Sequence, residues 1–154
     1  MEEVEPTVAE IMDSKVLAID LDSKARDCAK AMSKRGVGYA VVVQGKAAIG
    51  IVTERDLVSK VMGDALDPSK VLVRDIMSTP LITVGPQATM TEAAELMAEY
   101  KIRRLVVIGE GGALAGIVSS VAMARVLAKK HGYQEATLNA LAKYREGPGE
   151  GPYQ

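Results

Sequence analysis

The sequence predicts an α/β fold built from two copies of one β-α-β-β-α unit, packed sheet to sheet with pseudo-two-fold symmetry. Ile11-Met12 recurs as Ile76-Met77, a spacing of 76 − 11 = 65 residues. Gly50-Ile51-Val52 recurs as Gly116-Ile117-Val118, a spacing of 116 − 50 = 66 residues. Between these motifs the two halves carry the same order of apolar runs and helical patterns. Almost the whole chain is therefore one unit written twice.

The two halves open alike. Residues 7–12 and 72–77 predict short helical segments, and residues 16–19 and 81–84 predict short apolar strands. A longer helix follows in each half, because apolar residues recur at i, i+3, i+4 and i+7 on an otherwise charged segment. These residues are Ala25, Cys28, Ala29 and Met32 in the first half, and Met90, Ala93, Ala94 and Met97 in the second.

The longer helices also carry capping signals. Thr89 and Glu92 have the spacing of a capping box at the start of the second helix. Asp22 or Ser23 would cap the first.

A pair of strands then forms a hairpin in each half. Residues 40–43 and 105–108 are continuous, mostly β-branched runs, as in strands that are buried on both faces. Residues 48–52 and 114–118 supply the second strands. The connection in the second half is one residue longer, which explains why the spacing rises from 65 to 66. A further helix begins at about Thr53 in the first half and at about Ser119 in the second.

Neither half is large enough to bury both faces of its sheet alone, so we expect the pair to be the folding unit. The predicted domains are residues 7–66 and 72–127, with Asp67-Pro68-Ser69 in the linker between them. A helical extension is expected over residues 128–145. The glycine- and proline-rich tail, residues 146–154, is expected to be disordered.

Composition narrows the class of protein. Of the 154 residues 48% are hydrophobic and only 3% are aromatic, so the core must be built from aliphatic residues and methionine. A net charge of −1 provides no general attraction to nucleic acid or anionic membranes. With one cysteine, Cys28, and one histidine, His131, neither an intrachain disulfide nor a transition-metal site is expected.

No apolar run approaches the ~20 residues of a membrane span, and no signal peptide is evident. A cytoplasmic protein is the expectation.

The two copies differ in chemistry at one place. The first hairpin ends in Thr53-Glu54-Arg55-Asp56, and the second ends in Ser119-Ser120-Val121-Ala122. A carboxylate can accept two hydrogen bonds from a cis-diol. A hydroxyl where a strand meets a helix can face an anion. The alternative is structural: Thr53 caps the helix, while Glu54 and Asp56 complement its dipole.

The pattern resembles a tandem pair of CBS domains, the Bateman module. The resemblance covers roughly residues 7–127. One departure is Val41 and Val106, which stand where the family usually has a proline inside the middle strand. The residues that carry the resemblance are the two helical stripes, V-A-E-I-M (8–12), V-R-D-I-M (73–77), I-R-R-L-V-V-I (102–108), G-I-V-T-E-R-D (50–56) and the weaker G-I-V-S-S-V-A (116–122).

The resemblance implies an adenosine-containing ligand in a cleft between the repeats. In the family pattern the position of Asp56 holds the ribose hydroxyls and that of Thr53 faces phosphate. Apolar residues would sandwich adenine, and Arg103 and Arg104 would bind phosphate; their alternative is a solvated strand end paired with Glu95 or Glu99. The nucleotide-binding residues implied are Thr53, Arg55, Asp56, Thr79, Pro80, Leu81, Ile82, Arg103, Arg104 and Leu105.

A second, weaker cleft is implied by symmetry. Ala122 occupies its ribose-binding position, so this cleft is expected to be empty, weak or used by another ligand. Tyr39 could stack on a base there, although a tyrosine at a strand start also suits packing. The residues implied are Lys15, Val16, Gly38, Tyr39, Ala40, Ser119 and Ser120.

The resemblance implies a non-catalytic regulatory module that senses AMP, ADP or ATP, with or without Mg²⁺. No nucleophile–base arrangement suggests an enzyme, and neither a metal site nor a nucleic-acid or membrane partner is expected. A homodimer through helices 53–63 and 119–130 is expected, together with a regulated partner protein. The alternatives are a structural dimerisation or adaptor module with vestigial clefts, and a sensor of S-adenosylmethionine or NAD.

Overall fold

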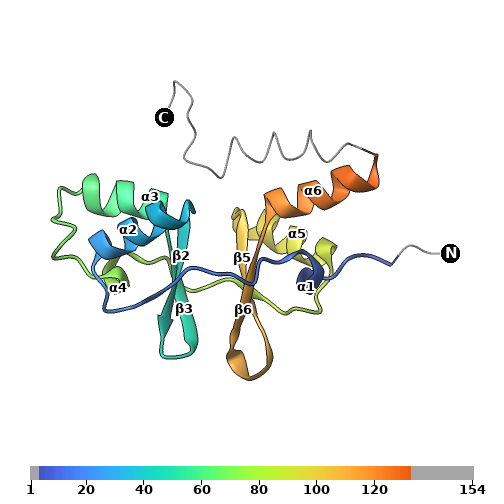
Figure 1. Cartoon of the computed structure of the whole chain (residues 1–154), viewed down its shortest axis with the longest axis horizontal. Helices are drawn as coiled ribbons and strands as arrows, with labels where there is room; N and C mark the ends of the chain where they lie inside the picture. The colour runs from blue at the N-terminus through green and yellow to red at the C-terminus, as the bar shows by residue number, and fades with distance from the viewer. Residues whose placement is uncertain (1–3, 133–154) are drawn as a thin grey trace. The chain divides into compact units, whose positions relative to one another are not determined.

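The computed structural model describes residues 4–132 of the chain (Figure 1). The expected helix from residue 133 onward and the expected tail lie outside the described residues. The described residues divide into two compact units. We call residues 16–81 the first unit, and residues 4–15 together with 82–132 the second unit.

The first unit is a three-stranded mixed sheet with helices (Figure 1). Its strand β1 pairs parallel to β2, and β2 pairs antiparallel to β3 with Val41 opposite Ile51. The helices α2, α4 and η1 contact one another. The elements are β1 (Ala18–Asp20), α2 (Ala25–Arg35), β2 (Tyr39–Gln44), β3 (Ala47–Thr53), α3 (Glu54–Asp56), the π-helix η1 (Leu57–Met62) and α4 (Val73–Ile76).

The second unit repeats this arrangement. Its strand β4 pairs parallel to β5, and β5 pairs antiparallel to β6 with Val106 opposite Ile117. The elements are α1 (Val8–Ile11), β4 (Thr83–Val84), α5 (Met90–Tyr100), β5 (Arg104–Ile108), the 3-10 turn η2 (Glu110–Gly112), β6 (Leu114–Ser119) and α6 (Ser120–Lys130). The predicted α/β class and the predicted order of elements in both halves are confirmed.

The N-terminal cap was predicted correctly for one of the two long helices. The capping box of Thr89 and Glu92 is present, as predicted. The prediction that Asp22 or Ser23 caps α2 is wrong, because the N-cap is Lys24 and its side chain makes no capping bond. Backbone pairing holds this segment extended: Lys24 bridges Leu72, and the carbonyl of Ser23 accepts from the amide of Val73 at 2.8 Å.

Each opening helix packs against the strands of the other copy of the repeat. In the first unit Ser78, just after α4, bridges Ile51 of β3. In the second unit Asp13, just after α1, bridges Ile117 of β6. The Ile-Met and Gly-Ile-Val motifs are therefore two sides of one contact, and that contact forms once in each unit.

Each unit has its own aliphatic core. Cys28 is in the first core, as predicted, and burial raises the pKa of its thiol to about 11, so it is a neutral packing residue at ordinary pH. The first core is Ala25, Cys28, Met32, Ala40, Val42, Val52, Val61, Val73 and Ile76. The second core is Val8, Val84, Ala93, Met97, Leu105, Val107, Val118 and Met123. Among the described residues no helix is long and apolar enough to cross a membrane.

Candidate functional site

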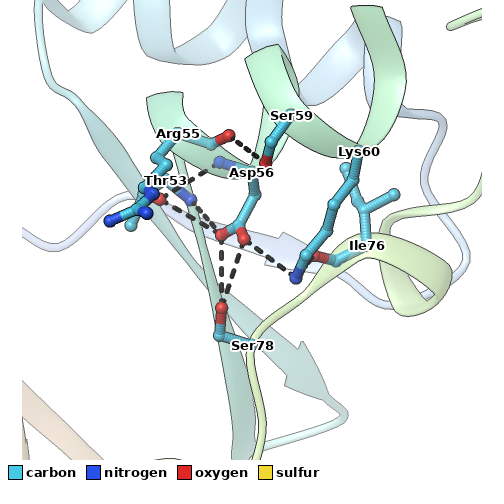
Figure 2. Close-up of polar contacts among 7 residues, drawn as sticks. All are labelled: Thr53, Arg55, Asp56, Ser59, Lys60, Ile76 and Ser78. Atoms are coloured by element: carbon cyan, nitrogen blue, oxygen red, sulfur yellow. Dashed lines mark hydrogen bonds and ion pairs between the residues drawn. The ribbon is translucent and has the colours of Figure 1, made fainter. Parts of the chain in front are cut away.

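The junction between β3 and α3 holds Thr53 and Asp56 in a reciprocal capping arrangement (Figure 2). The amide of Asp56 donates to Thr53 Oγ1 at 3.4 Å. In return the amide and the hydroxyl of Thr53 donate to Asp56 Oδ2, at 2.9 and 3.1 Å. The structural role that the sequence allowed for these two residues is therefore present.

Asp56 also accepts from two residues outside the capping arrangement. The Ser78 hydroxyl lies 3.2 Å from Oδ1 and 3.4 Å from Oδ2, and Lys60 Nζ forms an ion pair with Oδ1 at 3.0 Å. Only 6% of Asp56 is exposed to solvent, which makes it a buried charged residue with a complete set of partners. We call Thr53, Asp56, Lys60 and Ser78 the Asp56 cluster.

Lys60 joins this cluster to the end of α4. It stands one helical turn after Asp56, and its ammonium also donates to the carbonyl of Ile76 at 3.0 Å. Figure 2 shows the Lys60 side chain between the Asp56 carboxylate and the Ile76 carbonyl. The cluster therefore connects the strand–helix junction to the segment that contains Ser78.

The equivalent junction in the second unit has a different charge arrangement. Ser119 caps α6 by accepting from the amide of Ala122 at 3.1 Å, but Ala122 has no carboxylate to return a bond. Asp13 bridges Ile117 just as Ser78 bridges Ile51. A carboxylate is thus present on the opposite side of this junction, at the position of Ser78. Asp13 Oδ1 accepts from the backbone amide of Lys15 at 2.8 Å.

The profile of the CBS domain matches residues 8–63 and again residues 73–129. The chain belongs to the CBS domain family. An uncharacterised protein of Methanopyrus kandleri is 40% identical over 114 residues, which cover 73% of this chain and 58% of that protein. The chain thus spans little more than half of that relative's length.

Solved structures of CBS proteins have the same fold. A putative signal-transduction protein with CBS domains from Burkholderia ambifaria is 28% identical, with a TM-score of 0.76 over 84% of this chain and 99% of that one. A CBS domain protein of Pyrobaculum aerophilum, solved in complex with AMP, is 26% identical. Its TM-score is 0.69 over 90% of this chain and 99% of that one.

The structure places part of the predicted CBS ligand site in the first unit. Thr53 and Asp56 are in direct contact, and Thr79, Pro80 and Leu81 directly follow Ser78. In sequence these three residues belong to the second copy of the repeat, and in space they lie in the compact unit that contains Asp56. Arg55 is exposed and enters the contacts of Figure 2 through its backbone carbonyl, which accepts from Ser59 Oγ at 2.7 Å.

The remaining residues of the predicted first site lie in the second unit: Ile82, Arg103, Arg104 and Leu105. Leu105 is fully buried in the core of that unit, whereas Arg103 is exposed. The carbonyl of Arg103 accepts from the amide of Ser120 at 2.9 Å, which ties the start of β5 to the start of α6.

The predicted second site is divided in the same way. Lys15, Ser119 and Ser120 belong to the second unit, and Val16, Gly38, Tyr39 and Ala40 to the first. Tyr39 and Ala40 are buried, which favours packing as the role of Tyr39. The carbonyl of Gly38 accepts from the amide of Glu54 at 3.1 Å. Among residues 4–132 no group of three or more His, Cys, Asp or Glu side chains could hold a metal ion.

Sequence reasoning missed Ser78 and Lys60. Lys60 follows Asp56 at i+4, a spacing at which opposite charges meet on a helix, so this ion pair was detectable. Ser78 had a subtler signal. In an alignment of the two copies, Ser78 corresponds to Asp13 and Asp56 corresponds to Ala122. Each junction therefore has one acid, at the position of Asp56 in the first unit and at the position of Ser78 in the second.

Proposed function

We propose that this CBS pair is a non-catalytic regulatory module that binds an adenosine nucleotide, with Asp56 as the acceptor for the ribose hydroxyls. The observation that supports it is the buried Asp56 carboxylate, held by hydroxyl and ammonium donors beside residues 79–81. Two of its partners, the Thr53 and Ser78 hydroxyls, are the kind of donor that a ribose diol supplies. The relative solved with AMP supports an adenosine ligand as the class.

The phosphate end of the ligand is assigned from sequence. Arg103 and Arg104 are proposed as phosphate ligands because a guanidinium presents a planar fork of donors. That chemistry suits AMP, ADP and ATP alike, and Mg²⁺ would accompany the polyphosphates. S-adenosylmethionine and NAD carry the same ribose diol and are the competing ligands of this class.

Regulation would follow from differential affinity. If the nucleotide binds one arrangement of the pair more tightly than another, binding shifts the population toward that arrangement. A partner protein that contacts the pair would then sense the nucleotide, because the coupling acts in both directions.

Titration calorimetry tests the proposal directly. The intact chain is titrated with AMP, ADP, ATP with and without Mg²⁺, NAD and S-adenosylmethionine. Asp56→Ala should weaken binding by about 10- to 100-fold, because charge-assisted hydrogen bonds are lost. Asp56→Asn, which keeps the size of the side chain, separates loss of charge from loss of fold. Asp64→Ala is the matched control, since Asp64 is exposed on the same segment.

Two results would contradict the proposal in different ways. Absence of binding by every ligand would reject the sensor function. Wild-type affinity in folded Asp56→Ala would show that the ligand binds elsewhere.

A structural dimerisation module is the second candidate, and an exposed apolar stripe on η1 and the residues after it favours it. Val58, Met62 and Leu66 recur at every fourth position and are 61%, 77% and 47% exposed. Val58 and Met62 lie on η1 and Leu66 lies beyond its end, and an exposed apolar patch of this kind suits burial against a second copy of the chain. We propose this stripe as part of a homodimer surface, which is compatible with nucleotide binding.

The oligomeric state tests the dimer. Met62→Glu should convert a dimer into a monomer in analytical ultracentrifugation, because it places a charge in an apolar contact. Lys46→Glu, on the exposed β2–β3 turn, is the matched control. Wild-type protein that sediments as a monomer at all concentrations would exclude this surface as a dimer contact.

A further inference from the structure

We infer that Ser78 is a gating residue whose hydroxyl competes with the ribose for the Asp56 carboxylate. The inference rests on the proposed function and adds a control to the same site. It assigns a role to a residue that lies outside the motif G-I-V-T-E-R-D (50–56).

The Asp56 carboxylate has as many donors as it can accept. An ionised carboxylate offers about four lone-pair sites. Asp56 accepts from the amide and hydroxyl of Thr53, from Lys60 Nζ and from the Ser78 hydroxyl, which makes four donor groups. A cis-diol needs two acceptor positions on the same carboxylate. It can therefore bind only where two of these donors withdraw.

The donors to Asp56 differ in how easily they can withdraw. The Thr53 amide is part of the main chain at the end of β3, and its bond to Asp56 belongs to the capping arrangement that starts the helix. Ser78 is exposed, so its hydroxyl can turn to water. Lys60 is 43% exposed and keeps the Ile76 carbonyl as a second acceptor. Ser78 and Lys60 are the donors that a ribose would replace, while Thr53 continues to orient the carboxylate.

The junction in the second unit has the acid on the opposite side. There the position of Ser78 holds Asp13 and the position of Asp56 holds Ala122, although the backbone bridges are the same. Two carboxylates on these facing positions would repel each other. The joint exchange of both residues agrees with direct contact between the two positions, and each junction keeps a single acid.

Ser78→Ala in the intact chain tests the gate. Removing the hydroxyl frees one acceptor position, so affinity for adenosine and for AMP should rise by about three- to tenfold, the equivalent of one hydrogen bond. The gain should be equal for the two ligands, because the competition is at the ribose. Thermal unfolding without nucleotide should begin at a lower temperature, since Asp56 loses a partner. Titration calorimetry and calorimetric unfolding measure the two effects.

Ser59→Ala is the matched control. Its hydroxyl donates to the Arg55 carbonyl at 2.7 Å on the helix that carries Asp56, but it makes no bond to the carboxylate (Figure 2). It should leave nucleotide affinity unchanged. A third ligand, 2′,3′-dideoxyadenosine, lacks the diol and should show no gain from Ser78→Ala.

Each outcome separates the gate from the proposed function. If the wild-type chain binds the ligands and Ser78→Ala binds them with equal or lower affinity, the gate is overturned and the sensor function still stands. Binding by Ser78→Ala alone supports a gate that holds the wild-type site closed. Failure of all variants to bind adenosine or AMP rejects both the sensor function and the gate.

Discussion

Gly50 and Gly116 are the residues at which the two repeated motifs meet. A Cβ on Gly50 would lie 2.7 Å from Met77 Sδ and 3.2 Å from the carbonyl oxygen of Ser78. A Cβ on Gly116 would lie 2.8 Å from Met12 Sδ and equally close to the carbonyl oxygen of Asp13. The two copies thus differ in what a side chain would meet, because a methionine can move whereas a bridged carbonyl cannot move freely.

This difference predicts unequal costs for the same substitution. Gly116→Ala should destabilise the chain by about 1–3 kcal/mol, the usual cost of overpacking, because the Asp13–Ile117 bridge must open. Gly50→Ala should cost less, since Met77 can adopt another rotamer. Equilibrium denaturation of the intact chain measures both.

Gly85→Ala is the control for these two variants, because a Cβ there meets nothing within 4 Å. It should leave the free energy of unfolding nearly unchanged. A larger loss for Gly50→Ala than for Gly116→Ala would contradict the argument from the carbonyl contact.

The Asp56 cluster shows how far residue-level prediction can go. The relation of Thr53 to Asp56 is readable from their spacing, because a capping box depends on residues three apart. Ser78 is 22 residues from Asp56, and its contact depends on where α4 packs. No local rule predicts such a contact, so Asp56 was recognisable from its motif, whereas Ser78 could be found only by comparing the two copies.

At the scale of elements, periodicity predicted the long helices α2 and α5 well. In α2 the predicted stripe residues Ala25, Cys28 and Met32 are buried in the first core. In α5 Ala93 and Met97 are buried as predicted, but the prediction for Ala94 is wrong: it is exposed, and Leu96 packs against the second core. The segment after Thr53 was predicted as one helix over 53–63, but it continues from α3 into a π-helix over Leu57–Met62. There Gly63 donates to the carbonyl of Val58, five residues earlier, at 2.7 Å. An apolar stripe does not distinguish bonds to the fourth residue from bonds to the fifth.

At the scale of the whole molecule, the repeats in sequence and the compact units in space have different boundaries. Both copies contain an Ile-Met motif and a Gly-Ile-Val motif. The sequence alone therefore does not tell whether Ile11-Met12 packs on Gly50 or on Gly116. In the structure α1 completes the second unit and α4 completes the first. Because the two copies carry the same motifs, either Ile-Met motif could pack on either Gly-Ile-Val motif as far as the sequence shows. The three-dimensional structure is needed to tell which pairs form.

The boundary of the first unit predicts which of two fragments of equal length is the more stable. Residues 16–81 form a continuous segment of 81 − 16 + 1 = 66 residues that contains all of the first core. Residues 1–66 have the same length but lack α4, and so lose Val73 and Ile76 from that core. Each buried aliphatic side chain contributes about 1.5–3 kcal/mol, and a domain of this size is only marginally stable.

Fragment 16–81 should therefore show a more cooperative thermal transition by circular dichroism and better dispersed amide resonances than fragment 1–66. The backbone bonds reinforce the difference, because the carbonyl of Val71 accepts from Ala25 at 2.8 Å at the start of α2. Without that partner α2 loses the segment that covers its first turn. Equal stability of the two fragments would mean that α1 can replace α4 on the first sheet. The packing of α4 in the first unit and of α1 in the second would then not be required for folding.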